Sequence, residues 1–576
     1  MRQSIYLSLL LICRLCLYGQ DSPAMLPERV YLQTDKQLYL AGEVIWIKAL
    51  TTTPERIPLS FSKLAYVELL DETSSLQQIK IGLSEGVGEG SMRIPANTTT
   101  GCYRLTGYTR QMCNEGPAVF FETTIGIVNT FQPVLTGSGK DMIPTAKRDE
   151  TPKLPVTTGS GQTTAGDQAI LQDAGSLGET ITIPLSLNKQ TFTKREAGWL
   201  QIDGLPADVH TLSVAITGKS SLSVPGSNGL QQWCKQVKPS QAPLLDTWLP
   251  EYEGHIVTGK LVALDGSTEQ EAEVSALLCI PGEQLRVFAG KRNGDDVTFY
   301  LTDMTDATEI ITTTISRSNN YRLDIQPPFI QQHTSKQLPP LTVDSTHLDE
   351  LLKRSVALQL LPGPVKAPEA GLASRNKFIT IEPNRTYRLD DYTRFPKMDE
   401  LILEFVLGVR FRMREGKREI AMAVIRGEDI PWITPLVLLD GIPVKDHELI
   451  YQYNPLLVEK IDVYLKEYLF GGIKQDGIIA FTTYTHKYSE LKLDNTYQLI
   501  DYAGTQAKQR PYYSDNKRQP DLRHTLLWNP AIQTAGSASL IIPFHTSDYT
   551  GDFVVTVEGL TKTGKPVYAT LSFVVE

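Results

Sequence analysis

The sequence has few of the features on which disulfide-rich scaffolds and nucleic-acid binders depend. Its 576 residues include only six cysteines, too few for a disulfide framework. The 56 basic and 65 acidic residues give a net charge of −9, which is spread thinly and argues against a nucleic-acid binder. Hydrophobic residues make up 41% and charged residues 21%, as in globular proteins, so the length indicates roughly four domains.

The chain also lacks the motifs of common catalytic and metal sites. It contains neither a Gly-x-Ser-x-Gly nucleophile elbow nor a phosphate-binding loop motif. His447-Glu448 resembles the start of a zinc-protease helix, but Tyr451 stands where the second histidine is needed. No Cys/His cluster has metal-ligand spacing. We therefore predict no catalytic, cofactor-binding or metal-binding residues, no cofactor and no enzymatic activity. An enzyme with an unrecognised site is a third hypothesis, behind the two given below.

The first 19 residues are predicted to be an export signal. Arg2 supplies the positive start, Ile5 to Cys13 is an almost uninterrupted apolar run, and Gly19 offers a small residue at the cleavage point. The run is shorter than the about 20 apolar residues of a membrane helix, and no later stretch reaches that length. We expect an exported protein with no transmembrane segment after signal cleavage.

Strand patterns separated by turn signals predict a mainly β, multidomain chain. The expected order after the signal peptide is a β-sandwich over 26–129, a flexible linker over 130–175, a small β domain over 176–225, a β-sandwich over 251–327, a helical connector over 345–362, an α+β domain over 379–488 and a C-terminal β domain over 525–576. The linker has no aromatic residue between Phe131 and Phe192, so it cannot bury enough apolar surface to order itself.

The first domain carries a resemblance to a known family. The string ERVYLQTDKQLYLAGEVIWIKA, over 28–49, resembles the macroglobulin-like domain that opens α-2-macroglobulin-type proteins, and Thr34-Asp35-Lys36, Tyr39 and Gly42 have its most specific spacing. The segments 176–225 and 525–576 resemble further domains of such proteins. The segment 251–327 resembles a carboxypeptidase-regulatory β-sandwich. The resemblance implies immunoglobulin-like or macroglobulin-like β-sandwiches.

The α+β domain resembles the plug of TonB-dependent outer-membrane receptors. The matching strings are PLVLLDGIPV over 435–444, VEKIDVYL over 458–465 and LFGGIKQDGIIAFTT over 469–483. In that family the plug occludes a barrel of about 22 strands of about 10 residues each, for which the stretch after Tyr488 is too short. The resemblance therefore implies a plug-like fold without receptor activity, in an exported protein of a Gram-negative bacterium.

The macroglobulin resemblance also raises the question of a thioester. Trapping members of that family join Cys and Gln within Cys-Gly-Glu-Gln, where the two are three residues apart. Here Cys279 is five residues from Gln284, and Pro281 intervenes before Gly282-Glu283. A strand followed by a turn is the simpler interpretation, and covalent trapping is not expected. The sequence leaves open whether Cys102, Cys113, Cys234 and Cys279 form disulfides or are buried thiols, and it gives no connectivity.

One concentration of positive charge stands out in this acidic chain. Arg410, Arg412 and Arg414 alternate with Phe411 and Met413, and Lys417 and Arg418 follow closely. This is strand periodicity, with Phe411 and Met413 turned inward and the arginines on a solvated face. The alternative is a docking surface for an acidic partner or for lipid headgroups.

The function that these observations favour is a non-catalytic, exported protein of the cell envelope, in the periplasm or associated with the outer membrane. It would be a protein-binding or docking module of an outer-membrane assembly, with a barrel or an envelope complex as its partner. The alternative is an endopeptidase inhibitor of macroglobulin type without a thioester, for which 137–166 is the candidate bait segment.

Overall fold

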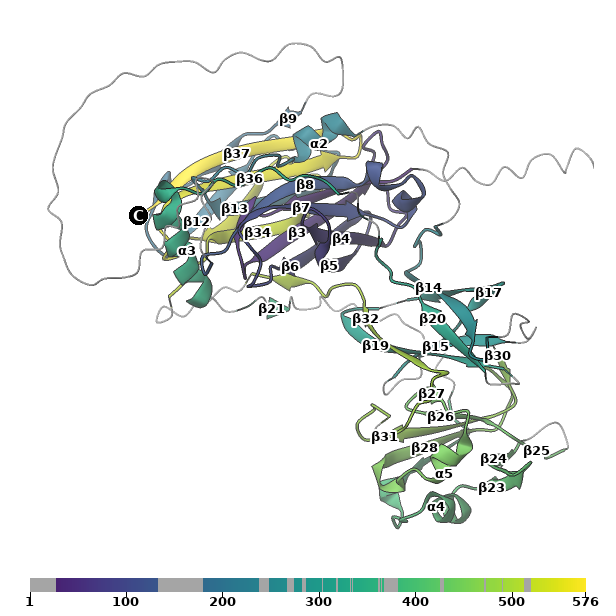
Figure 1. The fold of residues 1–576 in the computed structure, drawn as a ribbon. Helices are drawn as coiled ribbons and strands as arrows, with labels where there is room; N and C mark the ends of the chain where they lie inside the picture. The colour runs from purple at the N-terminus through teal and green to yellow at the C-terminus, as the bar shows by residue number, and fades with distance from the viewer. Residues whose placement is uncertain are drawn as a thin grey trace, which may run out of the picture.

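The computed structural model describes residues 27–132, 180–237, 248–266, 274–281, 286–302, 304–316, 320–331, 333, 335–360, 363, 365–366, 382–424, 429–470, 473–488, 490–511 and 520–576. In this part of the chain, strands far outnumber helices and form three β-sandwiches and one α+β domain (Figure 1). The predicted mainly β, multidomain fold class is therefore confirmed. The predicted signal peptide and most of the predicted linker lie outside the described residues.

The N-terminal sandwich packs a sheet of order β1-β3-β6 against a sheet of order β2-β8-β7-β4-β5. The strands are β1 Arg29–Thr34, β2 Leu38–Leu40, β3 Val44–Thr52, β4 Leu64–Leu70, β5 Ser75–Gly82, β6 Val87–Arg93, β7 Gly101–Tyr108 and β8 Phe121–Val128. In β3, Ile45, Ile47 and Ala49 belong to the sandwich core, and the alternation of a strand turns Trp46 and Lys48 to the other side. Both are buried there as well, so a second domain covers β3.

The C-terminal sandwich is built from two segments that are about 300 residues apart in the sequence. The first supplies β9 Ile181–Thr182, β10 Leu185–Leu187, β11 Thr191–Phe192, β12 Ala197–Ile202 and β13 Val209–Gly218, and the second supplies β34 Thr525–Ile532, β35 Leu540–His545, β36 Gly551–Thr561 and β37 Pro566–Val575. One sheet has the order β10-β12-β35 and the other the order β11-β37-β36-β13-β34.

This pairing corrects the expectation of two separate β domains over 176–225 and 525–576. Strand β13 pairs antiparallel with β34 on one edge and with β36 on the other, so the earlier segment sits inside a sheet of the later one. About 50 residues bury too little surface to be stable alone, which is why the two segments complete one another.

The middle sandwich also takes a strand from a distant segment. It contains β14 His255–Ala263, β15 Ser275–Ile280, β16 Arg286–Ala289, β17 Lys291–Asn293, β18 Asp296–Leu301, β19 Ala307–Ile315 and β20 Tyr321–Ile325. Its sheets have the orders β17-β18-β14-β20 and β16-β15-β19-β32, where β32 is Gln498–Ala503. The predicted boundary at 327 therefore missed one strand, which enters only after the α+β domain has been completed.

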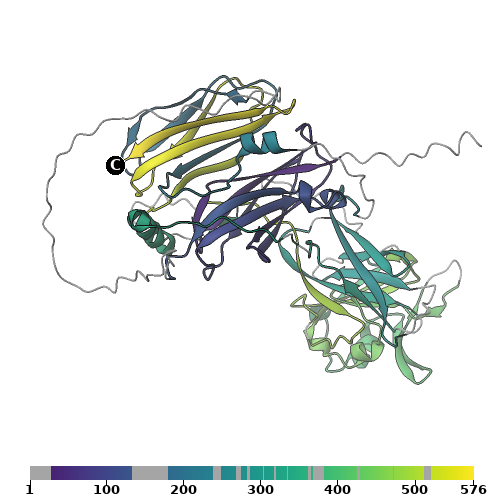
Figure 2. The ribbon, with the colours of Figure 1, turned by 45° about the horizontal axis from the view of Figure 1, so that its top comes forward.

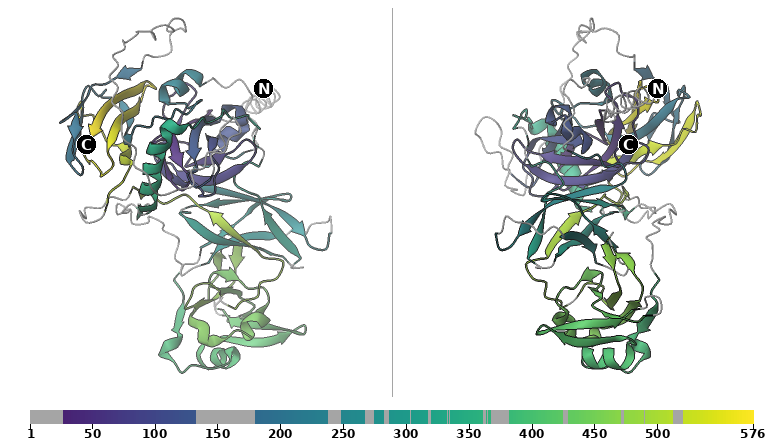
Figure 3. Two further views of the ribbon diagram at one scale, coloured as in Figure 1. Left: turned by 60° about the vertical axis from the view of Figure 1, so that its left-hand side comes forward. Right: turned by 90° about the vertical axis from the view of Figure 1, so that its right-hand side faces the viewer.

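The α+β domain lies at the end of the molecule remote from the first and last sandwiches (Figures 1 and 3). Its main sheet has the order β22-β28-β31-β26-β27, and a second sheet has the order β23-β24-β25. The elements are β22 Arg385–Arg388, α4 Met398–Phe405, β23 Val409–Arg414, β24 Lys417–Ala423, β25 Trp432–Ile433, β26 Leu436–Leu439, β27 Ile442–Pro443, α5 His447–Tyr451, β28 Val458–Tyr464 and β31 Ile478–Thr483. Between β28 and β31 the chain forms a small hairpin of β29 Tyr468–Phe470 and β30 Ile473–Gln475.

Two short helices lie against the sandwiches. Helix α2, Leu230–Gln236, follows the first half of the C-terminal sandwich, and its Leu230 and Trp233 join the core of the N-terminal sandwich. Helix α3, Leu348–Leu360, falls within the predicted helical connector over 345–362. Its Leu351 packs against strand residues of the N-terminal sandwich. The connector therefore carries the chain back across the molecule before the α+β domain begins.

The N-terminal and C-terminal sandwiches lie side by side and share a buried junction (Figure 2). Trp46, Ala215 and Trp528 form its apolar part. Beside them the Tyr31 hydroxyl donates a hydrogen bond to the Glu558 carboxylate at 2.8 Å. Burial raises the pKa of Glu558, because water no longer solvates its charged form. The junction links the domain nearest the N-terminus to strands at the other end of the sequence.

Candidate functional site

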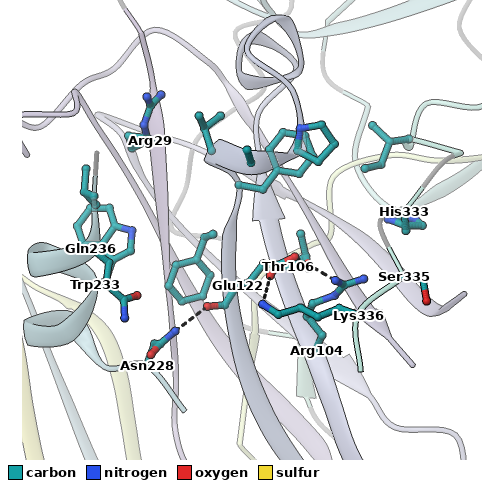
Figure 4. A pocket seen from close by; sticks show the side chains of 17 residues that line it. Arg29, Arg104, Thr106, Glu122, Asn228, Trp233, Gln236, His333, Ser335 and Lys336 are labelled. Carbon is teal, nitrogen blue, oxygen red and sulfur yellow. Dashed lines mark hydrogen bonds and ion pairs between the residues drawn. The ribbon is translucent and has the colours of Figure 1, made fainter. Parts of the chain in front are cut away.

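A cavity of about 700 Å³ lies between the N-terminal sandwich and two segments that cross it (Figure 4). Its floor is formed by β7 and β8, one wall by helix α2, a second by the short 3-10 turn at Pro117–Val119, and a third by the chain at 330–336. The lining residues used below are Arg29, Arg104, Ala118, Phe121, Glu122, Asn228, Trp233, His333, Ser335 and Lys336.

Glu122 is the centre of the polar part of the cavity. Its carboxylate forms ion pairs with Arg104 at 3.2 Å and with Lys336 at 2.9 Å, and its backbone oxygen accepts a hydrogen bond from the Asn228 side chain at 3.1 Å. Two cations thus share one carboxylate, and basic side chains outnumber acidic ones among the residues that line the cavity. Figure 4 shows these three contacts converging on Glu122 from β7, from the segment before α2 and from the chain at 336.

The apolar part of the cavity is held in place by aromatic packing. Phe121 and Trp233 are buried at 3% and 7% exposure, and both contact the ring of Tyr31, with centroids 5.4 and 5.1 Å away. Because these rings are fixed from behind, the apolar walls are preformed. A cavity of this size, with apolar walls and a few charged groups, is typical of a site that binds another molecule.

A serine and a histidine line the cavity, but the structure gives the histidine a structural partner. His333 lies 3.3 Å from the carboxylate of Glu68, which also accepts hydrogen bonds from the Tyr108 hydroxyl at 2.7 Å and from the Gln78 side chain at 2.8 Å. Glu68 is fully buried and belongs to this network. Ser335 is exposed, and no hydrogen bond among the described residues joins it to His333. The arrangement is therefore not that of an activated nucleophile.

The residues examined for metal and thioester chemistry have structural roles. The His447 ring accepts a hydrogen bond from the Ile420 N–H at 3.0 Å, and burial lowers its pKa. Glu448 pairs with Arg418 at 2.9 Å. Among the described residues no group of His, Cys, Asp and Glu is arranged to hold a metal ion. Cys279 is fully buried in β15, where burial strongly raises the pKa of its thiol.

The cysteine pairing that the sequence left open is resolved for the described residues. Cys102, Cys113, Cys234 and Cys279 are free thiols. The sequence around Gly282, Glu283 and Gln284 lies outside the described residues, as does the candidate bait segment 137–166.

A second polar cluster lies where the N-terminal sandwich meets the middle sandwich. Lys80 is 1% exposed, and its ammonium lies 3.9 Å from the ring centroid of Tyr502 and 5.8 Å from those of Tyr66 and Phe329. No hydrogen-bond acceptor reaches its Nζ within the described structure. Burial lowers the pKa of Lys80 to about 7, although the carboxylate of Glu251 acts in the opposite sense.

This cluster makes stability depend on pH. The ordinary pKa of lysine is 10.5, so between about pH 7 and 10.5 the unfolded chain holds a proton on residue 80 that the folded chain releases. Stability therefore increases with pH in this range, by about 2 kcal/mol from about pH 7 to about pH 9. We expect Lys80→Met to remove this gain in urea unfolding at the two pH values. Burial also lowers the pKa of Lys48 to about 7. Lys48 therefore adds a second increase of stability with pH, and the Lys80→Met variant keeps this increase. An equal pH dependence in both proteins would contradict the assignment.

The fold and the site define a multidomain β-sandwich protein with an inserted α+β domain and a preformed cavity lined by aromatic and charged side chains. The solved structures that resemble it include a variant of Salmonella α-2-macroglobulin, with a TM-score of 0.24 and 10% identity, covering 97% of this chain and 40% of that one. Trypsin-activated α-2-macroglobulin from Escherichia coli matches with a TM-score of 0.22 and 8% identity, over 97% of this chain and 42% of that one. This chain thus spans about 40% of the length of those proteins.

The comparisons with families and curated proteins give no further relative. No family model matches the chain, and no curated protein matches it in sequence. Among the described residues, no helix combines the length and the apolar character that a membrane crossing requires.

Proposed function

We propose that this chain is a non-catalytic, exported protein of a Gram-negative cell envelope that binds a protein partner. The cavity at Glu122 is the observation that carries the proposal. It is preformed, it is large enough for an apolar side chain and its neighbours, and no nucleophile or metal cluster is assembled around it in the described residues.

The charges of the cavity indicate the chemistry of the partner segment. Arg104 and Lys336 both contact the single carboxylate of Glu122. Arg29, which also lines the cavity, is paired with Glu115 at 2.8 Å. An apolar side chain next to an acidic one would fill the aromatic part and add a carboxylate near the basic side chains of the lining. We therefore take the partner segment to be a peptide that carries both.

The resemblance of the α+β domain to a receptor plug supports the finer part of the proposal. According to this finer part, the α+β domain docks to an outer-membrane assembly, while the cavity at the other end of the molecule holds the partner segment. The matching strings over 435–444 and 469–483 contribute the adjacent parallel strands β26 and β31.

Filling the cavity tests the proposal. Ala118 is exposed and lines the cavity, so Ala118→Trp is expected to occupy it without disturbing the core. Capture of the partner from the native envelope by the tagged variant should fall by about tenfold, which corresponds to about 1.4 kcal/mol of binding free energy. Ala538→Trp, an equally exposed alanine in the C-terminal sandwich, is the matched control and should capture as the wild type does. Equal capture by both variants would refute the role of the cavity.

A further inference from the structure

The arginine-rich strand β23 forms a hairpin with β24. The turn between them is formed by Glu415 and Gly416, with φ values of 53° and 77°, which is the left-handed conformation that tight hairpin turns require. The register places Arg412 opposite Glu419 and Arg414 opposite Lys417. Directly opposite residues share a face of a sheet, so the register defines which side chains lie together.

One face of this hairpin belongs to the core of the α+β domain. Val409, Ile420 and Met422 are buried in it, and Phe411 packs edge-on against the ring of Tyr451 at 5.2 Å. The expected inward position of Met413 is wrong, because its side chain is 62% exposed. Met413 lies one residue from the hairpin turn, beyond the end of the core that would have covered it.

The other face carries the charge. Arg410 lies over the ring of Trp432 at 4.0 Å, and Arg412 is tied to Glu419 at 3.5 Å and to the Thr434 hydroxyl at 2.9 Å. Stacking on Trp432 holds the Arg410 guanidinium in place, and the contacts to Glu419 and Thr434 hold that of Arg412. Each guanidinium has further N–H donors that can bind another group.

The balance of this face is strongly positive. It carries four basic side chains, Arg410, Arg412, Arg414 and Lys417, and one acidic side chain, Glu419. Arg410, Arg414 and Lys417 are exposed. Trp432 is 42% exposed beside them. Arginine and tryptophan are the residues most often found where protein partners bind tightly.

Strand β23 also has an open edge. The sheet has the order β23-β24-β25, so within the described chain β23 has a strand neighbour on one side only. A strand in this position can accept an extended peptide as an additional strand. Successive residues of an antiparallel strand rise by about 3.4 Å, so alternate side chains on it are about 7 Å apart, as are the three arginines.

We propose that β23 accepts an extended acidic segment of a partner protein as a fourth strand, with carboxylates at alternate positions set against Arg410, Arg412 and Arg414. A second copy of this chain is disfavoured as the occupant, since pairing two β23 strands would bring arginines against arginines. Charged residues on an edge strand normally block pairing, and here they make it selective for acidic strands. The surface lies in the α+β domain, apart from the cavity, so it extends the proposed function rather than depending on it.

The test uses the purified full chain and two fluorescent peptides of equal composition. In one, three glutamates alternate with threonines, and in the other the three glutamates are adjacent. Fluorescence anisotropy at low ionic strength should show about tenfold tighter binding of the alternating peptide, lost as salt is raised. The Arg410→Glu/Arg414→Glu variant should lose this binding. Lys466→Glu/Lys487→Glu, with the same charge change at exposed lysines outside this sheet, should retain it.

The outcomes separate the possible occupants. Equal affinity for the two peptides would overturn the proposal, and this comparison needs only the wild-type chain, so it stands even if the arginine variant fails to fold. Binding of phosphatidylglycerol vesicles together with failure to bind either peptide would overturn it in favour of a lipid surface. Self-association of the wild type that the arginine variant abolishes would overturn it in favour of a second copy. None of these results bears on capture through the cavity.

Discussion

A chain that lacks residues 525–576 is expected to leave the segment 180–237 without a folded sandwich. Strand β13 would lose both of its neighbours, β34 and β36. Each of the two segments supplies half of the buried hydrophobic residues in the shared core. We expect the truncated protein to be soluble only in part and to be cleaved within 180–237 by a low concentration of protease, where the full chain resists.

A two-chain version of the protein separates this effect from simple loss of mass. If a protease site placed between Pro511 and Pro520 is cut after folding, the sandwich should stay intact, since all of its strands are present. Adding a 520–576 peptide to the truncated chain during refolding should restore protease resistance. Resistance of 180–237 without any C-terminal strands would contradict the shared sandwich.

Replacement of Arg354 by methionine is expected to lower the free energy of unfolding by about 3 kcal/mol. Its guanidinium is 1% exposed and pairs with Glu43 at 3.0 Å, while also donating to the Leu38 carbonyl at 3.0 Å. Burial alone would raise the pKa of Glu43, but Arg354 and Lys36 hold it below its usual value. Without Arg354, the ammonium of Lys36 at 3.3 Å is the one cation among the described residues that still pairs with the largely buried carboxylate of Glu43.

The adjacent residue provides the matched control. Lys353 is on the same helix, but its side chain is 64% exposed and contacts Asp349 only at 3.8 Å. Lys353→Met should change the urea midpoint little, since exposed ion pairs contribute little to stability. The double variant Glu43→Leu/Arg354→Met should recover most of the loss because it removes both buried charges together. A loss of similar size in the Lys353 and Arg354 variants would show that the ion pair is not the cause.

Local patterns in the sequence predicted the strands better than their partners. Strand patterns predicted a β-sandwich over 26–129, and β3 is one of its strands, but nothing in these patterns showed that Trp46 would face another domain. The pairing of β13 with β34 joins segments about 300 residues apart. A β pattern indicates which side chains of a strand are buried, but it does not indicate which strand or domain they pack against.

The candidate site was beyond local patterns for the same reason. Arg104, Glu122 and Lys336 come from two strands and a distant connecting segment, and no motif spacing links them. The basic stripe at Arg410–Arg414 was visible because its residues alternate within one strand. The open edge of β23 could not be predicted from the sequence, because the position of a strand at the edge or in the centre of a sheet is known only once the sheet has assembled.

The central claim is that the cavity at Glu122 binds a partner protein, and photo-crosslinking from inside it is the most direct test. A photoreactive residue in place of Ala118, which lines the cavity, is compared in intact cells with the same residue in place of Ala538, an exposed alanine of the C-terminal sandwich. We predict one discrete crosslinked protein from position 118 and none from position 538. Absence of a crosslink from position 118, or the same products from both positions, would contradict the claim.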